Sequence, residues 1–401
     1  MTRTQRARRG ARGRRPPRLW CLPPAIQRDP DETLEGWHIL VEHDGELAAA
    51  LWCAFRDVTL WASVPDERRK SLFTASALHK RLELVRDSAG DSGVAVHLTA
   101  LASVVDNAAP ADPKGVSAAC SAVSQWAAAR SATGTAVAFA QAGALAVPNN
   151  AAAASAVGRL AARWGRLGRA ETWLRRGIGL ARRAGDWHTY AEAYVELGDL
   201  YRRRRRAEKS QRYFVLALRT CRRHPYTEAR AAALHGLSRL YMDEGELGDA
   251  ERHARMALRA YGSKHPRAPK VMHDLAELLV ARESYGRAIP ILQRLYRNVP
   301  ACPAFTLALI AHAAAATGER RLYEEAWSKA WALLDELGGG ERASRTLLEL
   351  ARAAGGLKDW LRVSLASERH AEQPGLSRNP HEAKEMADLA ALARRRAPEG
   401  A

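Results

Sequence analysis

The chain has 401 residues, with 62 Lys and Arg against 44 Asp and Glu, which gives a net charge of +18. Hydrophobic residues make up 47% of it and aromatic residues only 6%, a composition that suits close-packed helices and disfavours a β-sandwich or barrel. No apolar run approaches the ~20 residues that span a bilayer, and the five cysteines are scattered. We therefore expect a cytoplasmic protein with no membrane span and with reduced thiols.

Residues 1–30 hold nine Arg and one Asp among Gly and Pro, with no apolar periodicity. This composition predicts a disordered basic arm. Such an arm can bind a polyanion without sequence specificity, or it can simply be a solvated tail. Both interpretations stay open.

The next segment, residues 31–112, starts with an irregular acidic stretch as far as residue 45. Apolar residues at helical spacing then predict helices over 46–63, 65–88 and 94–107. These helices lack the pattern of small residues that recurs later in the chain. We therefore interpret the segment as a divergent helical N-terminal cap, since the ends of repeat arrays are usually atypical.

From residue 113 to residue 372 one pattern recurs, and its clearest copy is residues 190–221. Large apolar residues three or four apart predict two helices, each with one apolar stripe. Helix axes approach to about 8–10 Å only where some contact positions lack bulk, so small residues mark the crossing. The positions that define this copy are Tyr194, Leu197, Gly198, Tyr201, Ser210, Phe214 and Ala217.

The small residue of each predicted first helix, which we call the anchor, recurs every 34 to 40 residues. The anchors are Ser124, Gly158, Gly198, Ser238, Ala276, Ala311 and Ala351, and a second small residue follows most of them by twelve positions: Ala136, Ala170, Ser210, Ala250 and Ala288. This pattern resembles the tetratricopeptide repeat (TPR) family. The resemblance implies an all-α, right-handed superhelical solenoid of helix-turn-helix repeats, in which the first helix of each repeat lines a concave groove.

Two features near the C-terminal end need separate treatment. Pro290 falls inside a predicted second helix, where it should cause a kink or a late helix start. Residues 373–401 are predicted to form a linker and a C-terminal capping helix, because Asn379, Pro380 and Glu382 form a helix-start signal. That last helix should end at about Arg396.

We find none of the usual nucleotide-binding, hydrolase or metalloprotease motifs in the sequence. We therefore predict a non-enzymatic protein with no cofactor and no metal. His235, His273 and His312 could align as metal ligands across neighbouring first helices. Three imidazoles without a nearby Cys are more often ordinary groove residues.

The charge is concentrated in the middle of the chain, where residues 151–300 contain 30 Lys and Arg against 15 Asp and Glu. By the resemblance, the groove-facing residues of this region and the next repeat include Arg159, Arg163, Arg202, Arg203, His235, Arg239, Lys270, His273 and His312. Arginine forks would bind an acidic or C-terminal peptide there. Arginines also occur on predicted second helices, as at Arg175 and Arg219, so a generally basic, solvated surface fits the pattern equally well.

The run Arg202–Arg206 falls at the turn of one repeat, where it is either solvated or binds an acidic partner or nucleic acid. The sequence favours a scaffold that binds a peptide or protein in the groove. The alternatives are a sensor or regulatory module that acts with a transcriptional or signalling partner, and direct nucleic-acid binding through the arm and the middle repeats.

Overall fold

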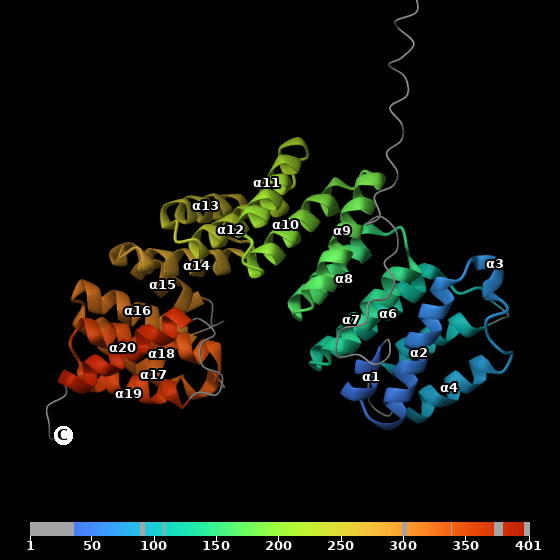
Figure 1. Ribbon diagram of the computed structural model, residues 1–401, viewed down its shortest axis with the longest axis horizontal. Helices are drawn as coiled ribbons and strands as arrows, with labels where there is room; N and C mark the ends of the chain where they lie inside the picture. Colours follow the sequence, from blue (N-terminus) through green and yellow to red (C-terminus); the bar gives the residue numbers. More distant parts are fainter. Residues whose placement is uncertain are drawn as a thin grey trace, which may run out of the picture. The chain divides into compact units, whose positions relative to one another are not determined.

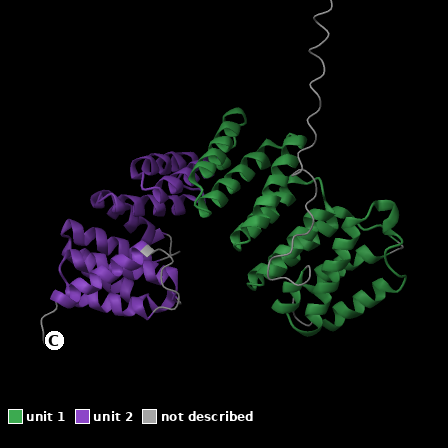
Figure 2. Cartoon of the chain, in the orientation of Figure 1, with its two compact units in different colours: residues 1–229 green, residues 230–401 purple. Residues whose placement is uncertain are grey.

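The computed structural model describes residues 36–88, 93–106, 109–298, 303–337, 339–372 and 380–396, and in these residues all regular structure is helical (Figure 1). The chain divides into unit 1, Met1–Ala229, and unit 2, Arg230–Ala401 (Figure 2). No helix of the described part is long and apolar enough to cross a membrane. The predicted arm, residues 1–30, lies outside the described residues.

The N-terminal region of unit 1 is built from short helices around one apolar cluster. They are α1 (Trp37–Glu42), α2 (Gly45–Ser63), α3 (Asp66–Arg69), α4 (Ala77–Ser88), α5 (Ala95–Ala102) and the 3₁₀ turn η2 (Ser103–Val105). The apolar stripe of α2 supplies Leu51, Phe55 and Val58, which are fully buried or nearly so. Helices α2 and α5 pack against the first hairpin, so this region closes one end of the unit 1 array.

Two predictions for this region are wrong. The helix predicted over 65–88 is interrupted, because α3 ends at Arg69 and α4 begins at Ala77. In the gap, Ser71 Oγ donates to the Arg68 carbonyl at 3.0 Å, and hydroxyl side chains that bond to nearby backbone compete with the helix. Helix α1 lies in the stretch that was predicted to be irregular.

Helix α1 is attached to a helix that lies far away in the sequence. The Glu42 carboxylate accepts hydrogen bonds from the backbone N–H of Gly134 at 2.7 Å and of Thr135 at 2.8 Å, and from Thr135 Oγ1 at 2.8 Å. These groups are at the start of α7 (Thr133–Ala146). A carboxylate there satisfies free N–H groups and complements the helix dipole, so Glu42 acts as a cap supplied from outside the helix.

Seven helical hairpins follow, one for each predicted anchor, in the part of the chain that the structure describes. In unit 1 they are α6 (Pro113–Ala129) with α7, α8 (Ala151–Arg163) with α9 (Leu167–Ala184), and α10 (Trp187–Arg203) with α11 (Ala207–Arg223). Helix α12 (Thr227–Asp243) leads into unit 2, where it pairs with α13 (Leu247–Tyr261), followed by α14 (Ala268–Ala281) with α15 (Tyr285–Asn298), α16 (Pro303–Thr317) with α17 (Arg320–Ala332), and α18 (Glu341–Gly356) with α19 (Trp360–Ala371).

The C-terminal helix α20 (Pro380–Arg396) packs against α18 and α19. A short 3₁₀ turn, η3 (Asp335–Leu337), follows α17. Helix α15 begins at Tyr285, before Pro290, so the proline does not delay the helix start. The chain is thus an all-α array of TPR-like hairpins with additional helices at both ends.

The turn inside each hairpin has one repeated geometry. At the seventh position after each anchor the backbone is left-handed, with φ between 53° and 78°, and these residues are Ser131, Gly165, Arg205, Gly245, Glu283, Gly318 and Lys358. The N–H of the next residue donates to the carbonyl of the third residue after the anchor, at 2.8–3.0 Å in all seven turns. This is the 6→1 bond of a Schellman motif, and every second helix begins nine residues after its anchor.

The predicted small residues do meet where the two helices cross. Ser124 Oγ donates to the Ala136 carbonyl at 2.7 Å and Ser238 Oγ to the Ala250 carbonyl at 2.8 Å. In the clearest copy the direction is reversed, and Ser210 Oγ donates to the Gly198 carbonyl at 2.8 Å. All three bonds join an anchor to the residue twelve positions later, so the register of the repeats is confirmed.

Gly198 allows a close approach of the two helices in this copy. A Cβ at this position would lie 2.6 Å from the ring of Phe214, which is fully buried. We expect Gly198→Ala to lower the free energy of unfolding by roughly 1–3 kcal/mol, because the buried ring has no space to move into. Urea denaturation of the full chain measures the change.

The matched control for this prediction is Gly168→Ala on α9, where an added Cβ meets nothing within 4 Å. This variant should be neutral or stabilising by up to about 1 kcal/mol, since Ala is the better helix former. Equal denaturation midpoints for the two variants would contradict the crossing contact.

Arg205 occupies the left-handed turn position with φ 53°, where three other hairpins have Gly. A side chain at this φ costs about 1 kcal/mol, so Arg205→Gly should raise the melting temperature. Arg206→Gly removes the same charge at a residue with φ −112° and should give no increase. If the melting temperature of Arg205→Gly does not rise, the backbone at Arg205 is not strained.

Candidate functional site

In unit 2 the first helices α12, α14, α16 and α18 present polar side chains to one another along one side, which we call the first-helix face. His235 Nε2 and Asp274 Oδ2 lie 2.7 Å apart, and Arg239 reaches the same carboxylate at 3.8 Å. Burial raises the pKa of Asp274, but the hydrogen bond with His235 and the nearby cations outweigh it, and the pKa is lowered. Asp274 is therefore a charged group that joins α12 to α14.

The next contact on this face spans two repeats. Arg345 of α18 forms an ion pair with Glu277 of α14, and its guanidinium lies 5.0 Å from the centre of the Phe305 ring on α16. The Phe305 ring also stacks on the His273 ring, with 5.6 Å between the ring centres. Burial raises the pKa of Glu277 and outweighs the opposing charge of Arg345. Phe305 thus contacts side chains of both α14 and α18.

Further along, His312 Nδ1 of α16 lies 2.7 Å from Glu349 Oε2 of α18. Arg352 contacts the same carboxylate and also bonds to Glu385 of α20. Burial raises the pKa of Glu349, but His312 and Arg352 more than compensate, so its pKa is lowered. Side chains from successive helices therefore pair along the whole described length of the face in unit 2.

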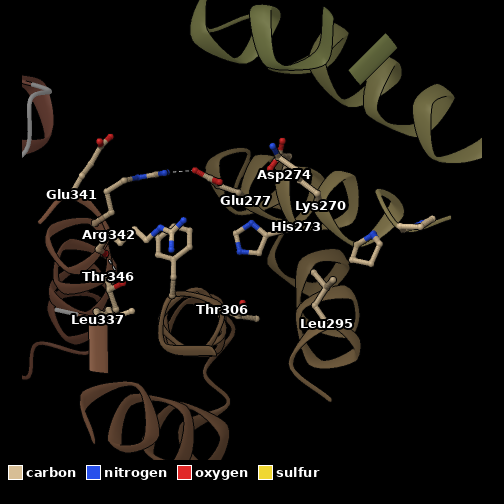
Figure 3. A pocket seen from close by; sticks show the side chains of 14 residues that line it. Lys270, His273, Asp274, Glu277, Leu295, Thr306, Leu337, Glu341, Arg342 and Thr346 are labelled. Atoms are coloured by element: carbon tan, nitrogen blue, oxygen red, sulfur yellow. Dashed lines mark hydrogen bonds and ion pairs between the residues drawn. The ribbon is translucent and has the colours of Figure 1, made fainter. Parts of the chain in front are cut away.

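The face contains a pocket of about 660 Å³ between α14 and α18 (Figure 3). Lys270, His273 and Glu277 extend into it from α14, and Arg342 and Thr346 border it from α18 (Figure 3). The remaining lining residues are Pro266, Pro269, Asp274, Leu295, Phe305, Thr306, Leu337, Glu341 and Arg345. The pocket thus combines apolar side chains with charged groups of both signs.

In unit 1 the predicted site residues lie on α8 and α10. Arg159 faces Glu192 of the next first helix at 3.8 Å, and Arg163 is exposed. Arg202 and Arg203 both bind Asp199, and Arg203 also donates to the Ala162 carbonyl at 2.9 Å. These last two arginines are therefore engaged within the fold.

Much of the positive charge in the middle repeats has such a structural use. Glu171 of α9 pairs with Arg204 of the next turn and with Tyr201 Oη at 2.6 Å. Two hairpins later, Glu251 of α13 pairs with Arg282 and Arg287. Of the predicted run Arg202–Arg206, the first three residues are thus bound to carboxylates rather than simply solvated.

The structure brings together four of the five predicted residues of unit 2, whereas His312 lies further along the face. His235 and Arg239 share Asp274, and Lys270 and His273 line the pocket. The three histidines considered as metal ligands have different neighbours: His235 contacts Asp274, His273 stacks on Phe305, and His312 contacts Glu349.

One group in the described residues has metal-ligand geometry, with ligand atoms of His273, Asp274 and Glu277 within 4.8 Å of one another. Both carboxylates already have partners within the fold, Arg239 and His235 for Asp274 and Arg345 for Glu277. The arrangement therefore favours ion pairs over a bound cation.

Sequence analysis missed Phe305, Arg342 and Arg345. A signal for two of them was present, because Phe305 and Arg345 lie six residues before their anchors, as Lys270 does. Arg342 lies one helical turn before Arg345 and carried no separate signal.

No family model matches the sequence, and no curated protein matches it. Solved structures with similar folds include a protein of Pseudomonas aeruginosa, pilF, at 17% identity, with 55% of this chain and 93% of that chain covered and a TM-score of 0.45. The apo form of RapI covers 70% of this chain and 97% of its own at 12% identity and a TM-score of 0.48. A Rap protein in complex with competence and sporulation factor covers 84% and 99% at 10% identity and a TM-score of 0.48.

The lowered pKa of Asp274 leads to a prediction for acid stability. A carboxyl group whose pKa is lowered in the folded state stabilises the fold above its unfolded pKa, and this contribution is lost as the pH falls through the folded value. We expect Asp274→Asn to lower the free energy of unfolding by roughly 1–3 kcal/mol at about pH 7. Below about pH 3 the variant and the wild type should converge, as measured by urea denaturation over a pH series. A difference that does not depend on pH would contradict the assignment.

Proposed function

We propose that this TPR-like repeat protein is a non-enzymatic scaffold that binds a peptide or protein segment on the faces formed by its first helices. The observation that supports it best is the pocket on the unit 2 face, where apolar and charged side chains from three successive first helices meet around about 660 Å³. Ligand sites are typically concave, largely apolar and equipped with a few convergent polar groups. An extended peptide could place successive side chains against successive rows of side chains on such a face.

The proposal is tested by affinity capture with the full chain, with and without nuclease, followed by elution over a salt series. A protein partner should remain bound after nuclease treatment. Direct nucleic-acid binding would be abolished by nuclease and would depend steeply on salt.

Charge reversal then separates a specific face from diffuse attraction. Replacing Arg159 and Arg163 of α8 by Glu should weaken binding of the captured protein at least about tenfold, because residues on one face converge on one ligand. The control, Arg212→Glu with Arg219→Glu, makes the same charge change at exposed residues of α11, a second helix. It should weaken binding by no more than about threefold, since exposed charges act mainly through screened long-range attraction. Equal losses in both pairs would contradict the proposal.

A further inference from the structure

The pocket on the unit 2 face has an apolar part that is fixed in place. Leu295 and Leu337 line it together with Phe305, whose ring contacts both the His273 ring and the Arg345 guanidinium. Its volume of about 660 Å³ is within the range of about 300–1,000 Å³ typical of ligand sites. An apolar side chain of a ligand would find a rigid surface there.

Some charged side chains of the pocket have partners of opposite charge, and others have none among the described residues. The carboxylates of Asp274 and Glu277 have cationic partners within the fold, Arg239 and Arg345. Lys270 on α14 and Arg342 on α18 are exposed, and among the described residues neither forms an ion pair or a side-chain hydrogen bond. Glu341 also lines the pocket, and its carboxylate has no cationic partner among the described residues.

A fourth polar group on the lining, His273, is incompletely bonded. His273 Nε2 is buried and has no hydrogen-bond partner in the described part of the chain. A buried imidazole nitrogen without a partner costs free energy, which a ligand atom can recover. The unpaired groups of the pocket are therefore two cations, one imidazole and one carboxylate.

We propose that this pocket binds an acidic–apolar element of a partner peptide, in which a side-chain carboxylate stands next to an aromatic or aliphatic residue. Lys270 and Arg342 bind the carboxylate through charge-assisted hydrogen bonds, and the apolar side chain packs on Phe305 between Leu295 and Leu337. The inference rests on the proposed peptide-binding function and adds the chemistry of the partner. A cationic ligand would find one unpaired lining carboxylate, Glu341, whereas Glu277 is already paired with Arg345 and Asp274 already contacts His235.

The probe is the blocked pentapeptide acetyl-Gly-Glu-Phe-Glu-Gly-amide, which has a carboxylate on either side of a ring. Its dissociation constant is measured with the full chain by ligand-observed NMR titration. Three control peptides replace both Glu by Gln, both Glu by Lys, or Phe by Gly. Each control should bind at least about tenfold more weakly than the probe.

The matching protein variant is Lys270→Ala with Arg342→Ala, which removes two exposed side chains that no ion pair of the described residues uses. It should weaken binding of the probe at least about tenfold and leave the melting temperature unchanged. The control, Arg294→Ala with Lys384→Ala, removes the same charges from exposed positions of α15 and α20 outside the pocket. It should bind the probe within about twofold of the wild type.

The inference is overturned if the probe fails to bind at about 10 mM, if the Lys peptide binds as tightly as the Glu peptide, or if both double variants lose equal affinity. The experiments distinguish a failure of this inference from a failure of the proposed scaffold function. A captured protein whose binding is weakened by Arg159→Glu with Arg163→Glu, but not by the pocket variant, overturns only the inference. Probe binding without any nuclease-resistant protein partner overturns the scaffold function and leaves the chemistry of the pocket supported.

Discussion

The close crossing of two helices within each hairpin is the constraint on which the rest of the fold depends. Small residues at the anchor, and in five of the seven described hairpins also twelve positions later, let the helices touch, and hydroxyl groups such as that of Ser124 bond across the contact. A Schellman turn then starts the second helix at the same offset in every hairpin. The turn and the start of the second helix keep the same distance from the anchor in each described hairpin. Equivalent side chains of successive first helices therefore fall in rows, and in unit 2 these rows form the first-helix face.

Ion pairs between successive hairpins are a second interaction that joins the repeats. Glutamates thirteen residues after an anchor, at Glu171, Glu251 and Glu324, bind arginines of the following hairpin. Each such carboxylate meets its partners at a partly buried position, where an unpaired charge would be costly. The basic composition of the middle repeats therefore serves assembly of the array as well as surface charge, and total charge alone is a poor guide to binding residues.

The sequence predicted the repeats well because their determinants are local. Anchor, turn and second helix lie within about twenty residues, so helical periodicity and small residues suffice to predict them. The N-terminal region was predicted less well, because its order depends on contacts such as Glu42 with Thr135, more than ninety positions away. The pocket was found only in part for the same reason. Lys270 and His273 were predicted, whereas Arg345 reaches Glu277 across an intervening helix and no local pattern requires that pair.

The pocket separates groups that build the face from groups that are available to a ligand. Arg345, Glu277 and Phe305 hold one another in position, and such preorganisation reduces the ordering that a ligand must induce on binding. Lys270 and Arg342 take no part in that network among the described residues, so their donors are free to meet an incoming carboxylate. Neither cation forms an ion pair among the described residues, so changes at Lys270 or Arg342 remove no ion pair of the face. On our proposal, the chemistry of recognition in this face is therefore set by residues outside the network that builds it.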